Sequence, residues 1–358
     1  MSEWRSLPGG RDLDTGETLK AIITGGAGFI GSNLTHRLVL EGHEVVVYDN
    51  LSRLGADRNV AWLRAEHGDR WTLLQADVRD FEALRRAAAD ADVIYHLASQ
   101  VAVTTSVQDP RHDFEVNALG TFNVLEAARL SGRNPLVLYA STNKVYGGME
   151  EVTVVEGEVA YAYRDYPGGI PESFPLDFHS PYGCSKGTGD QYVRDYARIY
   201  GLPTIVVRQS CIYGPRQFGI EDQGWVAWFI IAAVTGRSLT IYGDGKQVRD
   251  VLWVDDLLDL FQAAVARIDV AAGQVYNVGG GPENALAVWS ELGPMLESLL
   301  GFKIDVARNG WRPGDQRIFV ADIRKAEHEL GWRPKVGKEE GIRRLYEWVV
   351  ANKALFAR

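Results

Sequence analysis

Residues 20–40 read Lys-Ala-Ile-Ile-Thr-Gly-Gly-Ala-Gly-Phe-Ile-Gly-Ser-Asn-Leu-Thr-His-Arg-Leu-Val-Leu. The apolar, β-branched residues 21–24 predict a short buried strand, and the residues after the last glycine are compatible with a helix. Gly25, Gly28 and Gly31 therefore lie between a strand and a helix. In that context the first permits a tight turn, the second admits a pyrophosphate to the backbone amides, and the third lets the helix pack closely on the strand. The stretch predicts a dinucleotide site.

Carboxylates follow two of the predicted strands. Residues 44–48 form a second apolar run, and Asp49 comes next, about 20 residues beyond Gly31, where a ribose-binding carboxylate is expected. This carboxylate would repel a 2′-phosphate, although Arg53 is nearby, so NAD is favoured over NADP. Asp77 follows the third strand, where it either accepts from the adenine amino group or caps the helix that follows. The alternative to a dinucleotide site is a glycine turn that binds no ligand.

Composition narrows the class of protein. The 358 residues are 46% hydrophobic and 24% charged, and no apolar run approaches the ~20 residues of a membrane span. The net charge of -9 disfavours a nucleic-acid partner. Cys184 and Cys211 are too few for a disulfide framework and have no neighbours at metal-ligand spacing, so we expect a cytoplasmic protein without a metal site.

Short apolar runs alternate with helix-compatible segments, a pattern that predicts a parallel sheet with helices on both faces. The predicted strands are 20–24, 44–48, 71–75, 93–97, 136–140 and 204–208, and the predicted helices are 29–41, 57–66, 81–89, 111–131 and 182–200. This is an α/β fold with a doubly wound parallel (Rossmann) sheet, whose ligands bind outside the carboxyl ends of the strands.

The same patterns divide the chain into regions. Residues 1–18 have no apolar core and predict a flexible tail rather than a secretory signal. Residues 19–208 predict an NAD-binding Rossmann domain, to which the chain returns at about 251–280. Residues 209–358 predict a smaller, mixed α/β substrate-binding region. Residues 147–180 are rich in Gly, Pro and acidic residues, so we expect a long functional loop over the strand ends.

A tyrosine and a lysine stand four residues apart at the start of a predicted helix. The segment Ser-Pro-Tyr-Gly-Cys-Ser-Lys places Tyr182 and Lys186 on one face. Tyrosine ionises near pH ~10, so a nearby ammonium and a positively charged nicotinamide are both needed for it to act as a base at neutral pH. Ser141 or Thr142, at the end of the preceding strand, supplies a hydroxyl for the reacting oxygen. Turn-capping hydroxyls and a surface tyrosine are the alternative.

From residue 19 onward the chain resembles the extended short-chain dehydrogenase/reductase family, specifically its nucleotide-sugar epimerases and dehydratases. The resemblance rests on Thr-Gly-Gly-Ala-Gly-Phe-Ile-Gly, Tyr-Asp-Asn, Ala-Asp-Val-Arg-Asp, His-Leu-Ala, Val-Asn-Ala-Leu-Gly-Thr, the Tyr and Lys pair and Tyr-Gly-Pro-Arg. It implies Tyr182 as the base, Lys186 as the residue that tunes it, and Thr142 as its hydrogen-bonding partner. It also implies tightly held NAD, with contacts at Gly25, Gly28, Phe29, Ile30, Gly31, Asp49, Asn50, Asp77, Val78, Leu97, Ala98, Tyr182 and Lys186.

The residues after Thr142 bear on the reaction. Dehydratases of the family place Asp and then Glu there, whereas this chain has Asn143 and Lys144. Without an acid to protonate the departing hydroxyl and a carboxylate to remove the C5 proton, elimination lacks its machinery. The resemblance therefore implies reversible oxidation of a sugar alcohol, exchange of the ketone face and return of the hydride.

Three longer segments, at 141–147, 179–187 and 216–229, are similar to the branch of the family that inverts C2 of CDP-linked deoxysugars. The base and the carbon are implied by that resemblance alone. A UDP-sugar 4-epimerase is the alternative among enzymes. A non-catalytic, NAD-sensing interaction protein is the alternative outside them, because a fold alone does not define function.

Substrate contacts and assembly are implied in the same way. Arg249 and Arg312 correspond to the family's diphosphate-binding arginines, and a planar guanidinium can bind such oxygens bidentately, although solvated surface arginines are the alternative. Further substrate contacts are assigned to Asn143, Arg216 and, toward the nucleotide ribose, Asp315. The resemblance also implies a homodimer, in which the helices near 111–131 and 182–200 pair with a second subunit in a four-helix bundle.

Overall fold

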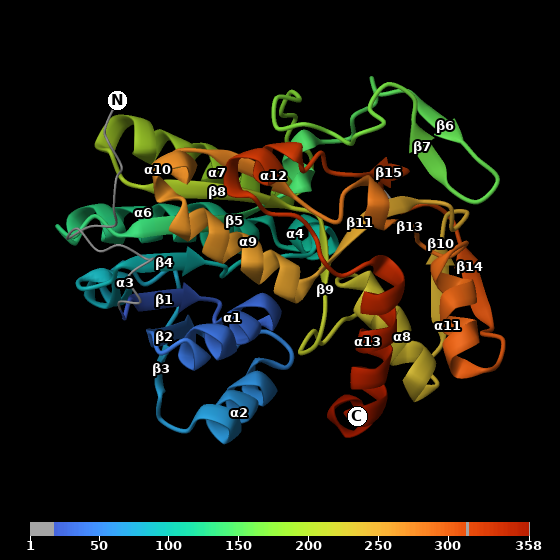
Figure 1. Ribbon diagram of the computed structural model, residues 1–358, viewed down its shortest axis with the longest axis horizontal. Helices are drawn as coiled ribbons and strands as arrows, with labels where there is room; N and C mark the ends of the chain where they lie inside the picture. The colour runs from blue at the N-terminus through green and yellow to red at the C-terminus, as the bar shows by residue number, and fades with distance from the viewer. Residues whose placement is uncertain (1–17, 313–314, 358) are drawn as a thin grey trace.

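The computed structural model of the chain describes residues 18–312 and 315–357, so all but the last residue of the predicted tail lies outside it. Its centre is a seven-stranded sheet in the order β12-β8-β5-β4-β1-β2-β3, with every neighbouring pair parallel (Figure 1). The strands are β1 (Lys20–Thr24), β2 (Glu44–Asp49), β3 (Trp71–Gln75), β4 (Val93–His96), β5 (Leu136–Thr142), β8 (Thr204–Gln209) and β12 (Val275–Val278). The predicted doubly wound sheet is confirmed.

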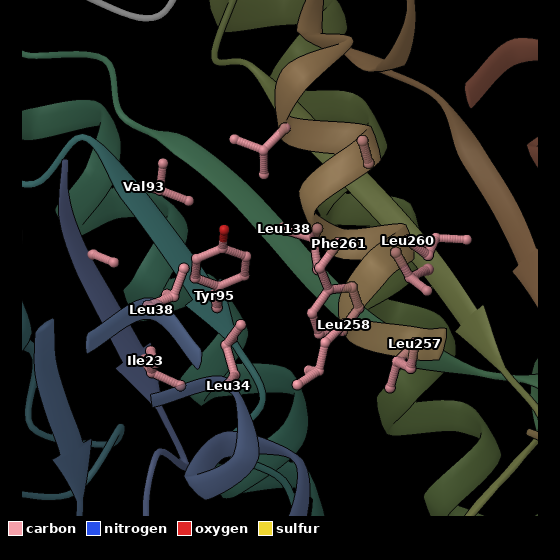
Figure 2. Close-up of a cluster of buried hydrophobic side chains, with 14 of the residues drawn as sticks. Ile23, Leu34, Leu38, Val93, Tyr95, Leu138, Leu257, Leu258, Leu260 and Phe261 are labelled. Carbon is pink, nitrogen blue, oxygen red and sulfur yellow. The ribbon is translucent and has the colours of Figure 1, made fainter. Parts of the chain in front are cut away.

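Helices cover both faces of this sheet. One face carries α1 (Phe29–Leu40), α2 (Ala56–His67) and α9 (Val254–Ala266), and the other carries α3 (Phe81–Ala88), α6 (Gly120–Leu130) and α7 (Ser180–Tyr200). Figure 2 shows the first interface, where Leu34 and Leu38 of α1 and Phe261 of α9 converge on Tyr95 of β4. The central strands β1, β4, β5 and β8 are buried on both faces, which explains why they are nearly continuous hydrophobic runs.

The strand order places the site. β1 pairs with β2 on one side and with β4 on the other. From β1 the chain builds outward through β2 and β3, and it then crosses to the other side of β1 to add β4 and β5. Connections at this point diverge to opposite faces and open a crevice at the carboxyl ends of β1 and β4. The turn after β1, which holds the three glycines, opens into this crevice.

A smaller lobe gathers beyond the carboxyl ends of the strands (Figure 1). It has its own apolar core, to which α8, β11 and α13 contribute. Its elements are β9 (Cys211–Tyr213), α8 (Trp225–Thr235), β10 (Leu239–Tyr242), β11 (Val248–Trp253), η4 (Pro282–Asn284), β13 (Ala285–Ala287), α11 (Leu292–Leu300), β14 (Val306–Asn309), β15 (Ile318–Phe319), α13 (Lys338–Ala351) and η5 (Lys353–Phe356). α10 (Ile268–Ala271) and α12 (Arg324–Leu330) return to the sheet. No helix in the described ranges is long and apolar enough to cross a membrane.

Two predicted segments differ from the structure. The helix expected at 111–131 is three pieces, because a π-helical turn, η2 (Glu115–Leu119), separates α5 (Pro110–Phe114) from α6. The expected loop at 147–180 contains a hairpin of β6 (Val154–Glu156) and β7 (Tyr161–Tyr163). Within the predicted Rossmann domain, the short elements α4 (Val103–Gln108) and the 3-10 turn η3 (Asn143–Tyr146) were not predicted.

Candidate active site

The three glycines of the turn after β1 have separate structural duties. Gly25 has φ +71°, and a Cβ there would lie 2.7 Å from the amide nitrogen of Ala98. A Cβ on Gly31 would lie 2.2 Å from the carbonyl oxygen of Gly25, so only glycine lets α1 approach β1 this closely. A Cβ on Gly28 would meet only that same carbonyl, at 3.1 Å, so its other side is open. Gly28 is also the N-cap of α1 and supplies no capping side chain.

The backbone amides at the start of α1 fit a dinucleotide pyrophosphate. The first amides of a helix lack intrahelical partners, and the helix dipole favours an anion there. Phe29 and Ile30, at the start of α1, line the large cavity of the molecule, and the backbone of Leu97 and Ala98 lies against Gly25. The site therefore fits NAD on its backbone geometry as well as on its sequence.

The strand-end carboxylates occupy different environments. Asp49 is buried, and its two carboxylate oxygens accept from the amides of Ala27 (3.0 Å) and Leu51 (2.8 Å). Burial raises the pKa of this carboxyl. Through these two hydrogen bonds Asp49 fixes the glycine turn. Asn50 follows it, directly after β2.

Asp77 is not the cap of α3, and that part of the prediction is wrong. Asp80 is the N-cap and accepts from the amide of Ala83 at 3.0 Å. Asp77 instead accepts from the Nδ2 of Asn50 (2.8 Å) and from the guanidinium of Arg79 (2.9 Å), and that guanidinium lowers the pKa of the Asp77 carboxyl. The contact of Asp77 with the adenine amino group stays a prediction. The next residue, Val78, packs in the core against Gly120 with its side chain.

The cavity beside the glycine turn has a volume of about 440 Å³. Its walls come from the carboxyl end of β5, the first turn of α7, β9, α8, β10 and β11. It therefore joins the crevice of the sheet to the smaller lobe. Of the predicted catalytic and substrate residues, it is lined by Thr142, Asn143, Tyr182, Arg249, Arg312 and Asp315.

Thr142 and Tyr182 come together at the base of this cavity. Burial raises the pKa of Tyr182 to about 12, and a hydrogen bond with Thr142 acts in the opposite direction. Ser141, the other predicted hydroxyl, donates instead to the carboxylate of Asp190 at 2.8 Å. Thr142 is therefore the hydroxyl left for the reacting oxygen.

Lys186 lies below this pair and is buried. Its Nζ donates to the carbonyl oxygen of Ala140 (2.6 Å) and lies 4.4 Å from the ring centre of Tyr139. Burial lowers the pKa of Lys186 to about 7, although the carboxylates of Asp113 and Asp190 raise it. The Lys186 ammonium thus contacts a carbonyl and a ring.

Two buried carboxylates that the sequence analysis did not identify hold α7 in place. Asp190 forms a bidentate ion pair with Arg208 of β8, at 2.9 Å for both contacts. Asp113 accepts from the hydroxyl of Ser185 at 2.5 Å. Asp190 follows Lys186 by one helical turn, a spacing that could have identified it. The sequence holds no comparable signal for Asp113, which depends on how α5 packs on α7.

The predicted phosphate-binding arginines are already engaged. The Nη2 of Arg249 lies 2.7 Å from the Oδ1 of Asp315. The Nη1 of Arg312 lies 3.3 Å from a carboxylate oxygen of Asp222, and its guanidinium lies 3.9 Å from the ring centre of Tyr242. Both arginines line the cavity and neither faces bulk solvent alone, so the surface-arginine alternative does not describe them.

Arg216 does not reach the cavity, and its assignment to the substrate is corrected. Its guanidinium lies 4.0 Å from the ring centre of Trp62 in α2 and 5.5 Å from that of Trp348 in α13. Cation–π attraction between two rings accounts for that position. Arg216 therefore joins the two lobes rather than contacting a ligand.

Three glutamines in the cavity wall were not predicted. Gln217 and Gln247 each donate their amide to a backbone carbonyl, which leaves both Oε1 atoms buried without a partner in the described part of the chain. The Nε2 of Gln209 is likewise buried and unpartnered there. Such atoms are costly unless a ligand or water satisfies them. These unpartnered atoms indicate that this wall of the cavity binds hydroxyl or amide groups of a ligand.

Comparisons with known proteins agree with this geometry. The GDP-mannose 4,6 dehydratase family matches residues 22–345. CDP-paratose 2-epimerase from Salmonella typhi is 44% identical over 337 residues, which cover 92% of this chain and 99% of that protein. The structure of Thermus thermophilus UDP-glucose 4-epimerase with NAD has a TM-score of 0.77 and 33% identity, covering 92% and 98% of the two chains. That of Thermotoga maritima UDP-glucose 4-epimerase with UDP-glucose has a TM-score of 0.79 and 30% identity, covering 94% and 100%.

These matches span the glycine turn, the Thr142, Tyr182 and Lys186 set, and the cavity that joins them. The chain therefore belongs to the GDP-mannose 4,6 dehydratase family and is an NAD-dependent enzyme of that family's group of nucleotide-sugar epimerases and dehydratases.

Proposed function

We propose that the protein is a nucleotide-sugar epimerase that inverts C2 of a CDP-linked deoxysugar, interconverting CDP-paratose and CDP-tyvelose. The observation that carries the proposal is that Thr142 and Tyr182 line one cavity with Arg249 and Arg312, without the acid pair that elimination requires. The 44% identity to CDP-paratose 2-epimerase supports the choice of base and carbon.

Tyr182 accepts the proton of the sugar hydroxyl and later returns it. Bound NAD supplies hydride transfer in both directions. In the cofactor-free chain burial opposes ionisation of the phenol, since it raises the pKa of Tyr182 to about 12. Positive charge nearby favours the phenolate. Lys186 lies one helical turn after Tyr182 in α7, so its ammonium and the cationic ring of bound, oxidised NAD would together lower that pKa. Thr142 donates to the reacting oxygen and holds it beside the phenol.

Epimerisation requires the ketone to present its second face before the hydride returns. The sugar is held through its diphosphate by Arg249 and Arg312, so its ring can turn while the nucleotide stays anchored. Asn143 offers amide groups in the place of a carboxylic acid, and these can bind sugar hydroxyls but cannot deliver a proton to a leaving group. Hydride then returns to the ketone, and its return to the second face completes the epimerisation.

A UDP-sugar 4-epimerase is the second candidate, favoured by two solved UDP-glucose 4-epimerases of similar fold. The two candidates differ in base and in carbon. Turnover of CDP-paratose and of UDP-glucose, followed by NMR of the inverted carbon, separates them. Inversion at C2 of the CDP-sugar supports the proposal, and inversion at C4 of the UDP-sugar contradicts it.

We also propose that two copies of the chain associate through α6 and α7. These helices expose large apolar side chains next to one another, including Phe122 and Tyr192, whose ring centres lie 6.0 Å apart. Tyr200 is 54% exposed on the same helix as Tyr192. Light scattering of the wild type and of Tyr192→Glu tests this: a dimer that the variant converts to a monomer is expected, and a monomeric wild type contradicts it. A cytoplasmic location stays a prediction.

A further inference from the structure

Three cations line the cavity, and one of them has no ion-pair partner within the described ranges. Arg249 is paired with Asp315, and Arg312 with Asp222. The third is Lys144, whose Nζ makes one hydrogen bond, of 3.3 Å, to the side-chain oxygen of Gln316. A partly buried charge without a counter-charge is costly, and a ligand that supplies the missing anion relieves that cost.

Lys144 lines the cavity, and its ammonium is positioned by Gln316. It belongs to η3, two residues after Thr142, and Gln316 is itself fixed because its amide donates to the carbonyl oxygen of Gly147. An ammonium has three donors, and among the described residues only one of them has a hydrogen-bond partner. The backbone oxygen of Gln316 accepts from Arg249 at 2.7 Å, so Lys144 and Arg249 meet at the same residue.

Its position along the cavity indicates which ligand group it meets. In the function proposed above, Thr142 meets the reacting sugar and Arg249 the diphosphate. Lys144 lies two residues after Thr142 and shares Gln316 with Arg249, so it is near both residues. The anionic group of a nucleoside diphosphate sugar that lies between sugar and nucleotide is the phosphoryl group attached to the sugar.

Resting on the function proposed above, we propose that Lys144 is a substrate-binding residue that contacts the sugar-proximal phosphoryl group of the nucleoside diphosphate and completes a three-cation site with Arg249 and Arg312. A nucleoside monophosphate lacks that group. Lys144 therefore separates diphosphates from monophosphates, whereas the base is recognised elsewhere in the cavity.

Calorimetric titration of the NAD-loaded protein with CMP and with CDP tests the assignment. Lys144→Met is expected to weaken CDP binding by roughly tenfold to a hundredfold and to leave CMP binding within about twofold, because only the diphosphate loses a charge-assisted contact. Lys303→Met, which removes a lysine on the exposed surface paired with Glu297, is the matched control and should bind both ligands as the wild type does.

The pH dependence gives a second readout. Burial and the charge of Arg249 lower the pKa of Lys144 to about 8, while Asp315 and Cys211, the other titratable groups facing it, raise it. The wild type should therefore lose CDP affinity as pH rises from 7 to 9, since the ammonium deprotonates. Lys144→Arg, whose guanidinium stays charged, should retain CDP affinity at pH 9.

The outcomes separate this inference from the proposed function. An unchanged ratio of CMP to CDP affinity in Lys144→Met overturns the inference while the epimerase proposal stands. Equal weakening of both ligands also overturns it, because the lysine would then act on the nucleotide as a whole. If the wild type binds neither CDP nor UDP, the nucleotide-sugar function fails and the inference fails with it.

Discussion

The two proposed phosphate sites, the glycine turn and the part of the cavity lined by Arg249 and Arg312, are built differently. The turn offers backbone amides, and a neighbouring atom would lie 2.2 Å from any Cβ on Gly31. The cavity offers side chains, and Arg249 and Arg312 are paired with the carboxylates of Asp315 and Asp222. Gly31 therefore tolerates no side chain, whereas the arginines of the cavity can exchange a carboxylate partner for a phosphate.

Tyr182 stands where the two regions meet, and its removal should have the largest effect. Tyr182→Phe removes the proton acceptor without altering the glycine turn. Turnover is expected to fall by a factor of about 10² to 10⁴, in keeping with the loss of a general base. Titration with NAD should give the affinity of the wild type. Undiminished turnover would remove Tyr182 from its assigned role.

Alanine substitutions at two glycines of the turn separate its structural role from its role in binding the cofactor. Gly31→Ala forces α1 away from β1 and should cost about 1–3 kcal/mol or more of unfolding free energy. Gly28→Ala places its methyl group in the open space meant for the pyrophosphate, so the melting temperature should change little while NAD affinity falls. Thermal melting of cofactor-free samples and NAD titration measure both. Equal melting temperatures for the two variants would contradict the division of duties between these glycines.

The two arginines should differ in importance. Arg249 is buried and Arg312 is more exposed, so water and salt screen the second more strongly. Arg249→Met is expected to weaken CDP binding by roughly 10- to 100-fold, and Arg312→Met by less. CDP titrations at low and high salt provide the measurement. A larger loss for Arg312→Met would reverse the order.

The smallest expected effect is on stability as a function of pH. The folded-state pKa of Lys186, about 7, lies below its unfolded value of ~10.4, so the unfolded chain binds more protons between these limits. The unfolding free energy of the cofactor-free protein should therefore rise as pH rises from 7 to 9.5. Lys186→Met should remove that part of the slope, on the order of 1–3 kcal/mol across the window. Lys335→Met, at the exposed surface, is the control.

The comparison also explains which parts could be predicted from the sequence. Backbone demands leave strong local signals: glycine spacing, Asp49 at the end of β2 and the alternation of strands and helices predicted the sheet and the cofactor turn. The π-helical turn at Glu115–Leu119 leaves no such signal, because its residues are ordinary helix formers.

Side-chain partners across the cavity were harder to predict. The pairing of Arg249 with Asp315 and the displacement of Arg216 onto Trp62 depend on how distant segments meet. The ammonium of Lys144 reaches Gln316 only because η3 and the segment before β15 lie side by side. Local sequence constrains such long-range contacts weakly, so motif resemblance located the residues but not their partners.

The most direct test of the central claim uses CDP-paratose deuterated at C2. A transient oxidation that stores the hydride on tightly held cofactor predicts CDP-tyvelose that retains the deuterium at C2, formed without exchange with solvent and observed by NMR. Loss of the deuterium to water would indicate deprotonation instead of hydride transfer, and that result, or no inversion at C2, would contradict the account.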